Sequence, residues 1–162
     1  VGGHCIPVDP WYLVEYGRQS RVSLPLIETG LRENEEMTSH VAKKLFSLYT
    51  KGMRVLLYGL TYKKDVKDIR ESPALRLAEM LRKKHVPFAA YDPLFKGQEI
   101  TNLGLQSGNL GMVDIFIVGT DHSQLKKDYT KCISKHTIVV DGRNFFSQRM
   151  GKALYGVGRT LL

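Results

Sequence analysis

Short apolar runs alternate with helical segments between residues 54 and 141, and this alternation constrains the fold more than any other feature of the sequence. Each run ends at or beside a glycine or an aspartate, as expected for a buried strand followed by a turn. Strands that alternate with helices pair in parallel through right-handed crossovers, so the pattern predicts an α/β layer fold. The predicted strands are Arg54–Leu60, Val86–Tyr91, Val113–Thr120 and Thr137–Asp141.

A long amphipathic helix is predicted ahead of this alternation, from about Pro25 to Tyr49. Its apolar positions recur at steps of three and four residues, with charged residues between them. Because little neighbouring chain is available to cover this stripe, we expect a partner surface, either further sequence or a second subunit. The stripe consists of Leu26, Ile27, Leu31, Met37, Val41, Leu45 and Leu48.

Turn and capping residues predict the remaining segments. Ser72 is the expected N-cap of a helix, with Pro73 in its first turn. The predicted loops are 1–10 and 97–112, the second with at most a weak helix, and the predicted helices are 74–84 and 123–129.

The composition excludes several classes of protein. With 43% hydrophobic and 25% charged residues, this chain of 162 residues is ordinary for a globular protein and unlike a disordered or disulfide-dense one. Its apolar runs fall far short of the roughly 20 residues that cross a bilayer, so no membrane partner is expected. Two cysteines fit a reducing compartment, which predicts a cytoplasmic protein.

The net charge of +8 bears on the ligand. The basic excess lies mainly in residues 82–162, but no nucleic-acid motif or basic-aromatic repeat accompanies it, so nucleic acid is not an expected partner. Scattered Lys and Arg suit a small phosphorylated ligand better. A solvated basic face is the alternative explanation.

The residues that follow the strands are the candidate ligand contacts, because parallel sheets bind ligands beyond the carboxyl ends of their strands. Only Gly59 follows the first strand, where a dinucleotide-binding fingerprint has three glycines, so a standard NAD-binding half is not expected. Lys63, Arg70 and Arg143 follow strand ends and could bind anions instead. A charge-rich surface loop explains their spacing equally well.

Two further clusters are not expected to be catalytic. Asp121-His122-Ser123 holds the residue types of a triad, but adjacent side chains point in different directions, and helix capping explains the Asp and the Ser better. His4, Cys5 and Cys132 lack the ligand spacing of a zinc site, so no metal is predicted.

Cys5 lies in a stretch rich in glycine and proline, Gly2-Gly3-His4-Cys5-Ile6-Pro7-Val8-Asp9-Pro10. The glycines let the backbone approach a ligand closely, and the proline stiffens the turn. A thiol presented in this way is a nucleophile once deprotonated, and Asp9 is placed to position a water or a proton. The alternative is an inert small hydrophobe.

Two long motifs resemble one family. Residues 1–13, VGGHCIPVDPWYL, closely resemble the catalytic-cysteine loop of the UDP-glucose/GDP-mannose dehydrogenase family, the nucleotide-sugar 6-dehydrogenases. Residues 59–74, GLTYKKDVKDIRESPA, resemble the opening of that family's C-terminal UDP-binding domain. Three shorter motifs recur in order, Tyr91-Asp92-Pro93, Thr120-Asp121-His122 and Asp141-Gly142-Arg143. The resemblance covers essentially the whole chain.

The resemblance implies a Rossmann-like, UDP-binding domain over residues 51–162, preceded over residues 1–50 by the catalytic-cysteine loop and a central dimerisation helix. The family oxidises the C6 alcohol of the sugar to a carboxylate with two NAD. Its NAD-binding domain precedes the cysteine loop, so the chain resembles a C-terminal fragment. The expected partners are a UDP-sugar, the missing NAD-binding domain and a second subunit in a homodimer.

The resemblance also implies residue roles at the matching positions. Cys5 is expected to attack the intermediate aldehyde, and Asp9 to assist hydrolysis of the thioester that follows. Gly2 belongs to the loop around the sugar, and Arg70 corresponds to an arginine near the nicotinamide cofactor. The substrate contacts expected from the UDP-binding domain are Tyr62, Lys63 and Arg143.

The cysteine loop bears on the choice of sugar. UDP-glucose enzymes of the family usually read Gly-Gly-Ser-Cys-Phe-Pro-Lys-Asp, whereas His4, Ile6 and Val8 resemble members that act on UDP-N-acetylhexosamines. The expected substrate is UDP-N-acetyl-D-mannosamine, with UDP-N-acetylglucosamine and UDP-glucose as alternatives. A non-catalytic UDP-sugar-binding module and a basic nucleic-acid binder are the competing hypotheses.

Overall fold

The computed structural model describes residues 1–148 and 150–158, and in these residues five parallel strands form a sheet. The strands are β1 (Val55–Tyr58), β2 (Ala89–Tyr91), β3 (Ile115–Val118), β4 (Ile138–Asp141) and β5 (Ala153–Gly156). They lie in the order β2-β1-β3-β4-β5, and each neighbouring pair is parallel. The predicted α/β fold with a Rossmann-like sheet is confirmed.

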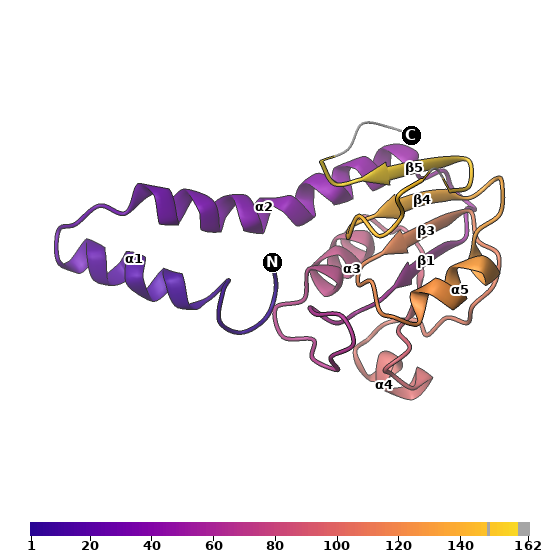
Figure 1. Cartoon of the computed structure of the whole chain (residues 1–162), viewed down its shortest axis with the longest axis horizontal. Helices are drawn as coiled ribbons and strands as arrows, with labels where there is room; N and C mark the ends of the chain where they lie inside the picture. The colour runs from indigo at the N-terminus through magenta and orange to yellow at the C-terminus, as the bar shows by residue number, and fades with distance from the viewer. Residues whose placement is uncertain (149, 159–162) are drawn as a thin grey trace.

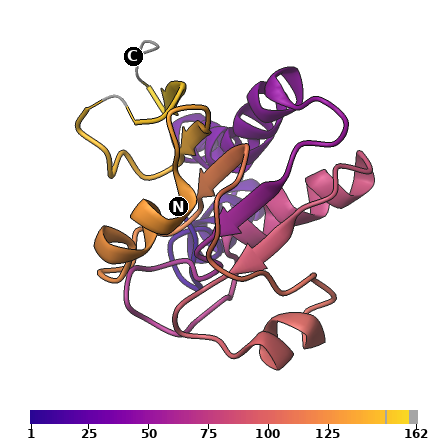
Figure 2. The same ribbon diagram turned by 90° about the vertical axis from the view of Figure 1, so that its right-hand side faces the viewer.

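Helices cover both faces of this sheet (Figures 1 and 2). Figure 1 shows α3 and the end of α2 on one face and α5 on the other. The helices are α1 (Asp9–Gln19), α2 (Pro25–Leu48), α3 (Pro73–Lys83), α4 (Gly97–Asn102) and α5 (Leu125–Cys132).

The core lies on both faces of the central strands. Leu57 and Ile117 belong to the cluster that also contains Leu45 of α2, whereas Phe116 belongs to the opposite cluster with Leu125 of α5. Every residue of β1, β3 and β4 is buried, which explains why their sequences are apolar, except for Asp141 at the end of β4, rather than alternating.

The long helix α2 and the shorter α1 form a helical arm, residues 9–48, that projects from the sheet in Figure 1. The expectation that α2 lacks local cover is wrong in part, because α1 packs along it and Leu31 is buried there. The far end of α2 packs on α3 and buries Leu45. Leu26 and Met37 of the predicted stripe remain 85% and 45% exposed.

Several element boundaries differ from those predicted. The strand β5 was not predicted, α4 forms inside the predicted loop 97–112, and α5 begins at Leu125 rather than at residue 123. Helix α1 begins at Asp9, within the predicted loop 1–10. Of the predicted domain 51–162, residues 149 and 159–162 lie outside the described residues, and the division at residue 50 stays a prediction.

Within residues 1–148 and 150–158, no helix combines the length and apolar character that a bilayer span requires.

Candidate functional site

The carboxyl edge of the sheet, defined here as the loops that follow β1, β2, β3 and β4, holds the candidate site. The strand order reverses between β1 and β3, and such a switch point is where α/β sheets bind ligands. Gly59 follows β1 with a φ of +84°, and a Cβ there would lie 2.5 Å from the carbonyl oxygen of Thr120. This glycine therefore lets two strand ends approach each other.

A buried Asp–His pair joins three of these loops. Asp92, after β2, accepts a hydrogen bond from the backbone N–H of Leu60 at 2.7 Å and lies 3.1 Å from Nε2 of His122. Both side chains are at most 1% exposed. Burial acts to raise the pKa of Asp92, but the hydrogen bonds from His122, Leu60 and Leu94 outweigh it and lower that pKa.

Hydroxyl groups fix the carbonyls of the β1 loop, defined as residues 60–66. Thr120 donates to the carbonyl of Thr61, and Thr61 in turn donates to the carbonyl of Lys63 at 2.9 Å. Ser72 donates to the carbonyl of Leu60 at 2.7 Å. Ser72 occupies the N-cap position of α3, as predicted, but its hydroxyl makes no capping bond to the helix.

The geometry of His122 agrees with the prediction that it is not a triad residue. Asp92 and Thr61 both lie beside the same ring nitrogen, Nε2, so the imidazole does not link a carboxylate to a hydroxyl through its two nitrogens. The predicted capping role of Ser123 is wrong, because its Oγ donates to Asp65 at 2.6 Å and Gln124 is the N-cap of α5.

Arg143, after β4, reaches across the edge to the β1 loop. Its Nη2 donates to the carbonyl of Tyr62 at 2.9 Å, and its Nε lies 3.4 Å from Oδ1 of Asp121. The buried Nε forms no hydrogen bond of acceptable geometry with any residue in 1–148 and 150–158. Asp141 orients this turn, because it accepts from the backbone N–H groups of Arg143 and Phe146.

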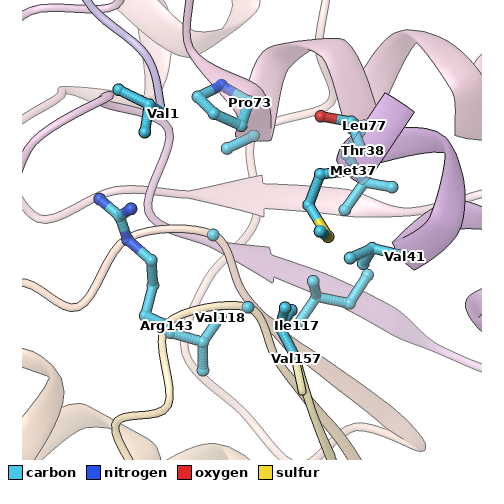
Figure 3. A pocket seen from close by; sticks show the side chains of 13 residues that line it. Val1, Met37, Thr38, Val41, Pro73, Leu77, Ile117, Val118, Arg143 and Val157 are labelled. Atoms are coloured by element: carbon cyan, nitrogen blue, oxygen red, sulfur yellow. The ribbon is translucent and has the colours of Figure 1, made fainter. Parts of the chain in front are cut away.

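A pocket opens beside Arg143, where the carboxyl ends of β3 and β4 meet α2 and the first turn of α3. It encloses about 630 Å³ of space that is partly open to solvent. Figure 3 shows the guanidinium of Arg143 on one side of the pocket and the side chains of Met37, Thr38 and Val41 on another. The pocket thus combines an apolar wall with a cation. The contribution of α2 was not predicted.

The cysteine loop, residues 1–8, lies directly against the segment that follows β1. The backbone N–H of Gly3 donates to the carbonyl of Arg70 at 3.1 Å. A Cβ on Gly3 would lie 2.8 Å from the ring of Tyr62, and one on Gly2 would lie 2.6 Å from the carbonyl oxygen of Glu71. Only glycine permits this approach.

Cys5 and Asp9 lie at the exposed end of the cysteine loop. The Cys5 thiol is free, and the carbonyl of Cys5 accepts a hydrogen bond from the backbone N–H of Asp9 at 2.7 Å. This bond places Asp9 at the start of α1, one turn from the thiol.

Arg70 lies beside the cysteine loop and is held by a carboxylate. Its Nε lies 3.0 Å from both carboxylate oxygens of Asp68, and its Nη2 is 2.5 Å from Oδ2. Hydrogen bonds from Arg70 lower the pKa of Asp68 to about 2. The hydrogen bond from Arg70 to Asp68 and the charge of that carboxylate raise the pKa of Arg70.

The structure brings most of the predicted site residues together. Gly2 packs on Tyr62, Arg143 binds the carbonyl of Tyr62, and Cys5 lies near Arg70. Lys63 is exposed and forms no side-chain hydrogen bond or ion pair within residues 1–148 and 150–158. The roles predicted for these residues stay predictions. Among the same described residues, no cluster of His, Cys, Asp and Glu is arranged to hold a metal ion.

The comparisons with known proteins agree with this geometry. The family model described as "UDP-glucose/GDP-mannose dehydrogenase family, UDP binding domain" matches residues 56–148, which contain β1 without its first residue, β2 to β4 and the loops of the carboxyl edge.

Three relatives illustrate the similarity. The chain is 30% identical to a UDP-N-acetyl-D-mannosamine dehydrogenase of Methanococcus vannielii, over 94% of this chain and 37% of the relative. It is 28% identical to a UDP-glucose 6-dehydrogenase of Bacillus subtilis, over 98% of this chain and 38% of the relative. A solved UDP-glucose dehydrogenase of Pyrobaculum islandicum superposes with a TM-score of 0.84 and 25% identity, over 98% of this chain and 38% of that chain. The chain thus spans less than half of the proteins that it matches, and it belongs to the UDP-glucose/GDP-mannose dehydrogenase family.

Proposed function

We propose that this chain is the cysteine-loop and UDP-binding part of an NAD-dependent nucleotide-sugar 6-dehydrogenase that oxidises UDP-N-acetyl-D-mannosamine to a uronate. The observation that carries the proposal is the contact between the two motifs. Gly3 donates to Arg70 and packs on Tyr62, so the cysteine loop and the segment after β1 form one continuous surface. A nucleophile and a nucleotide site must lie this close if one substrate is to reach both.

The UDP part of the substrate is assigned to the carboxyl edge. Arg143 supplies a guanidinium that lines the pocket, Lys63 an exposed ammonium and Tyr62 an aromatic ring against the cysteine loop. The first turn of α3 also faces this pocket through Pro73 and Ala74, and it carries neither an acidic side chain nor a side-chain cap. Its positive dipole end therefore favours a phosphate there.

The sugar end of the substrate is assigned to the cysteine loop. Gly2 leaves room beside Tyr62, and the exposed thiol of Cys5 can reach a bound aldehyde. The Cys5 thiolate adds to the aldehyde carbon: the C–S bond forms as the C=O π bond opens and its oxygen takes up a proton. Loss of a hydride from this carbon and of the proton from the oxygen leaves a thioester. Asp9 then accepts a proton from the water that hydrolyses the thioester to the carboxylate.

The binding of NAD is assigned mainly to the part of the dehydrogenase that this chain does not span. When bound, NAD accepts the hydride of each oxidation step. The loop after β1 offers NAD no glycine-lined phosphate site, because the backbone of Thr120 already fills the space beside Gly59. Arg70 is the one residue of the chain proposed to face the cofactor. The relatives are more than twice as long, which leaves room for an NAD-binding domain in the part that the chain does not span.

The choice of sugar rests on the cysteine loop and on the relatives. His4, Ile6 and Val8 favour a UDP-N-acetylhexosamine, and the M. vannielii relative acts, by its name, on UDP-N-acetyl-D-mannosamine. UDP-glucose is the alternative, because the B. subtilis relative is almost as similar. A UDP-sugar-binding module without catalysis is the second alternative for the chain on its own.

We also propose that the protein is a cytoplasmic homodimer joined through the helical arm. The arm exposes large apolar side chains, among them Tyr12 at 72% and Leu26 at 85%, and both cysteines are free. A mass measurement by light scattering at high protein concentration is expected to give the dimer. A strictly monomeric mass would contradict this part of the proposal.

The decisive experiment uses the complete dehydrogenase with NAD. Cys5→Ser is expected to abolish uronate formation from UDP-N-acetyl-D-mannosamine, while Cys132→Ala, which removes the buried thiol behind the sheet, retains it. Since Cys5 is exposed, its substitution should change the free energy of unfolding by less than about 0.5 kcal/mol. Normal product yield from Cys5→Ser would overturn the proposed chemistry. Higher kcat/KM on UDP-glucose would instead select the alternative substrate.

A further inference from the structure

The buried imidazole of His122 has no part in the chemistry proposed above, yet it contacts the β1 loop on both sides of Lys63. Its Nδ1 lies 3.0 Å from the backbone nitrogen of Asp65, and its Nε2 lies 3.2 Å from Oγ1 of Thr61. The ring is 1% exposed. A polar ring so fully removed from water requires partners for both nitrogens.

The partners of the ring define its tautomer. The backbone N–H of Asp65 can only donate, and the Asp65 carboxylate lies farther from Nδ1, at 3.6 Å, so Nδ1 is assigned as the acceptor and the proton to Nε2. Nε2 then donates toward Asp92 at 3.1 Å and toward Thr61 at 3.2 Å. Thr61 can accept this bond because its own proton is donated to the carbonyl of Lys63.

Two chains of hydrogen bonds therefore connect one imidazole to the backbone at Lys63 and two residues after it. One passes through the hydroxyl of Thr61 to the carbonyl of Lys63, and the other reaches the N–H of Asp65 two residues later. We infer that His122 is a positioning residue that directs the Lys63 ammonium toward the bound nucleoside diphosphate. The inference rests on the proposed function, because Lys63 acts there as a substrate contact.

The surroundings of Lys63 support a role beyond stability. Lys63 is exposed, and no described side chain holds its ammonium, so only its backbone can set its direction. Asp65 has a φ of 56°, an unfavourable conformation for a residue other than glycine. Its N–H bond to His122 and the bond from Ser123 to its carboxylate hold it there. Loss of the Nδ1 acceptor should therefore release the loop next to Lys63.

The test is a double-mutant cycle on UDP affinity, measured by calorimetry with this protein and UDP as the probe. His122→Gln keeps a donor near the Nε2 position but removes the Nδ1 acceptor, whereas His122→Asn keeps an acceptor near the Nδ1 position. Lys63→Met removes the ammonium and is expected to weaken UDP binding roughly tenfold. His122→Gln is expected to weaken binding about three- to fivefold in the original background and by less than about twofold beside Lys63→Met. His122→Asn should weaken it less than His122→Gln.

Other outcomes separate the inference from the proposed function. Equal losses from His122→Gln in both backgrounds would contradict the positioning role alone, because a purely structural effect does not depend on the Lys63 ammonium. Absence of UDP binding to the unsubstituted protein would contradict the proposed function, and this inference with it. If neither His122 variant folds, the ¹⁵N spectrum of the imidazole in the unsubstituted protein decides, since a proton on Nδ1 would overturn the inference.

Discussion

The carboxyl edge of the sheet and its amino edge, defined as the segments that precede β1, β3 and β4, differ in how far their polar side chains are buried. At the carboxyl edge, Asp92, His122 and Thr120 are at most 1% exposed and bonded across different loops. At the amino edge, Asp114 is 42% exposed and accepts from Arg54, whose side chain is 68% exposed. Thr137 is a buried exception there, and it donates to the carbonyl of Val113.

The difference indicates where the fold has been adapted to bind something. Buried polar groups are costly unless every partner is in place, so a fold of this size has few of them. Their concentration at the carboxyl edge gives the β1 loop and Arg143 fixed positions. The polar side chains of the amino edge are not fixed in this way, and most of them remain exposed to water.

The largest effect is expected from Asp92. Asp92→Ala leaves His122 and two backbone N–H groups without their buried acceptor, and it should lower the free energy of unfolding by about 4 kcal/mol. The matched change at the amino edge, Asp114→Ala, should cost about 1 kcal/mol because water can replace the carboxylate. Urea unfolding measures both. Equal losses would contradict the contrast between the edges.

The contribution of Asp92 should depend on pH. Its pKa in the folded protein lies below the value of about 3.9 in an unfolded chain. The stability that the carboxylate supplies is therefore complete above about pH 5 and is lost as the pH falls through the folded pKa. The difference in unfolding free energy between the unsubstituted protein and Asp92→Ala should narrow below pH 4. If this difference in unfolding free energy instead grows as the pH falls, the pKa of Asp92 is raised rather than lowered by folding.

Replacing a glycine by alanine is also expected to cost more unfolding free energy at the carboxyl edge than at the amino edge. Gly59→Ala would place a methyl group 2.5 Å from Thr120 in a residue with positive φ, and it should cost about 3 kcal/mol. Gly52 has a φ of +96° but open space where a Cβ would lie, with no neighbouring atom within 4 Å, so Gly52→Ala isolates the backbone strain at about 1 kcal/mol. Thermal unfolding of both variants tests the close approach of β1 and β3. Equal decreases in Tm would contradict it.

The smallest expected effect concerns binding rather than stability. Arg143→Lys keeps the charge but loses the planar group that bridges Tyr62 and Asp121, and UDP affinity should fall roughly tenfold, about 1.4 kcal/mol. Arg54→Lys at the amino edge should leave UDP affinity unchanged. Calorimetry distinguishes the two, and the assignment fails if Arg54→Lys weakens binding as much as Arg143→Lys.

Much of the fold follows from the sequence because buried parallel strands are apolar throughout. The cores of β1, β3 and β4 lie within their predicted runs for this reason. Strand β5 has a half-buried edge sequence, Ala153–Gly156, that ends in glycine and lacks this signal. The local cover of α2 by α1 depends on how the chain turns between them, and helical periodicity does not contain that information.

The candidate site was only partly predictable for a related reason. Strand ends in a parallel sheet meet at one edge, so the contact between Arg143 and the β1 loop could be expected from their places in the sequence. The direction of a hydroxyl could not. Ser72 and Ser123 have the residue type of helix caps, but tertiary contacts turn them toward Leu60 and Asp65. The role of His122 depends on the same contacts.

The central claim is that the carboxyl edge, with the cysteine loop against it, binds the UDP part of the substrate. A titration of ¹⁵N-labelled protein with UDP, followed by assigned amide NMR spectra, tests this claim most directly. Shifts are predicted for residues 59–63, 119–122 and 142–143, and none for residues 50–54 or for Asp114 at the amino edge. Shifts confined to the amino edge or the helical arm, or no shifts at millimolar UDP, would contradict it.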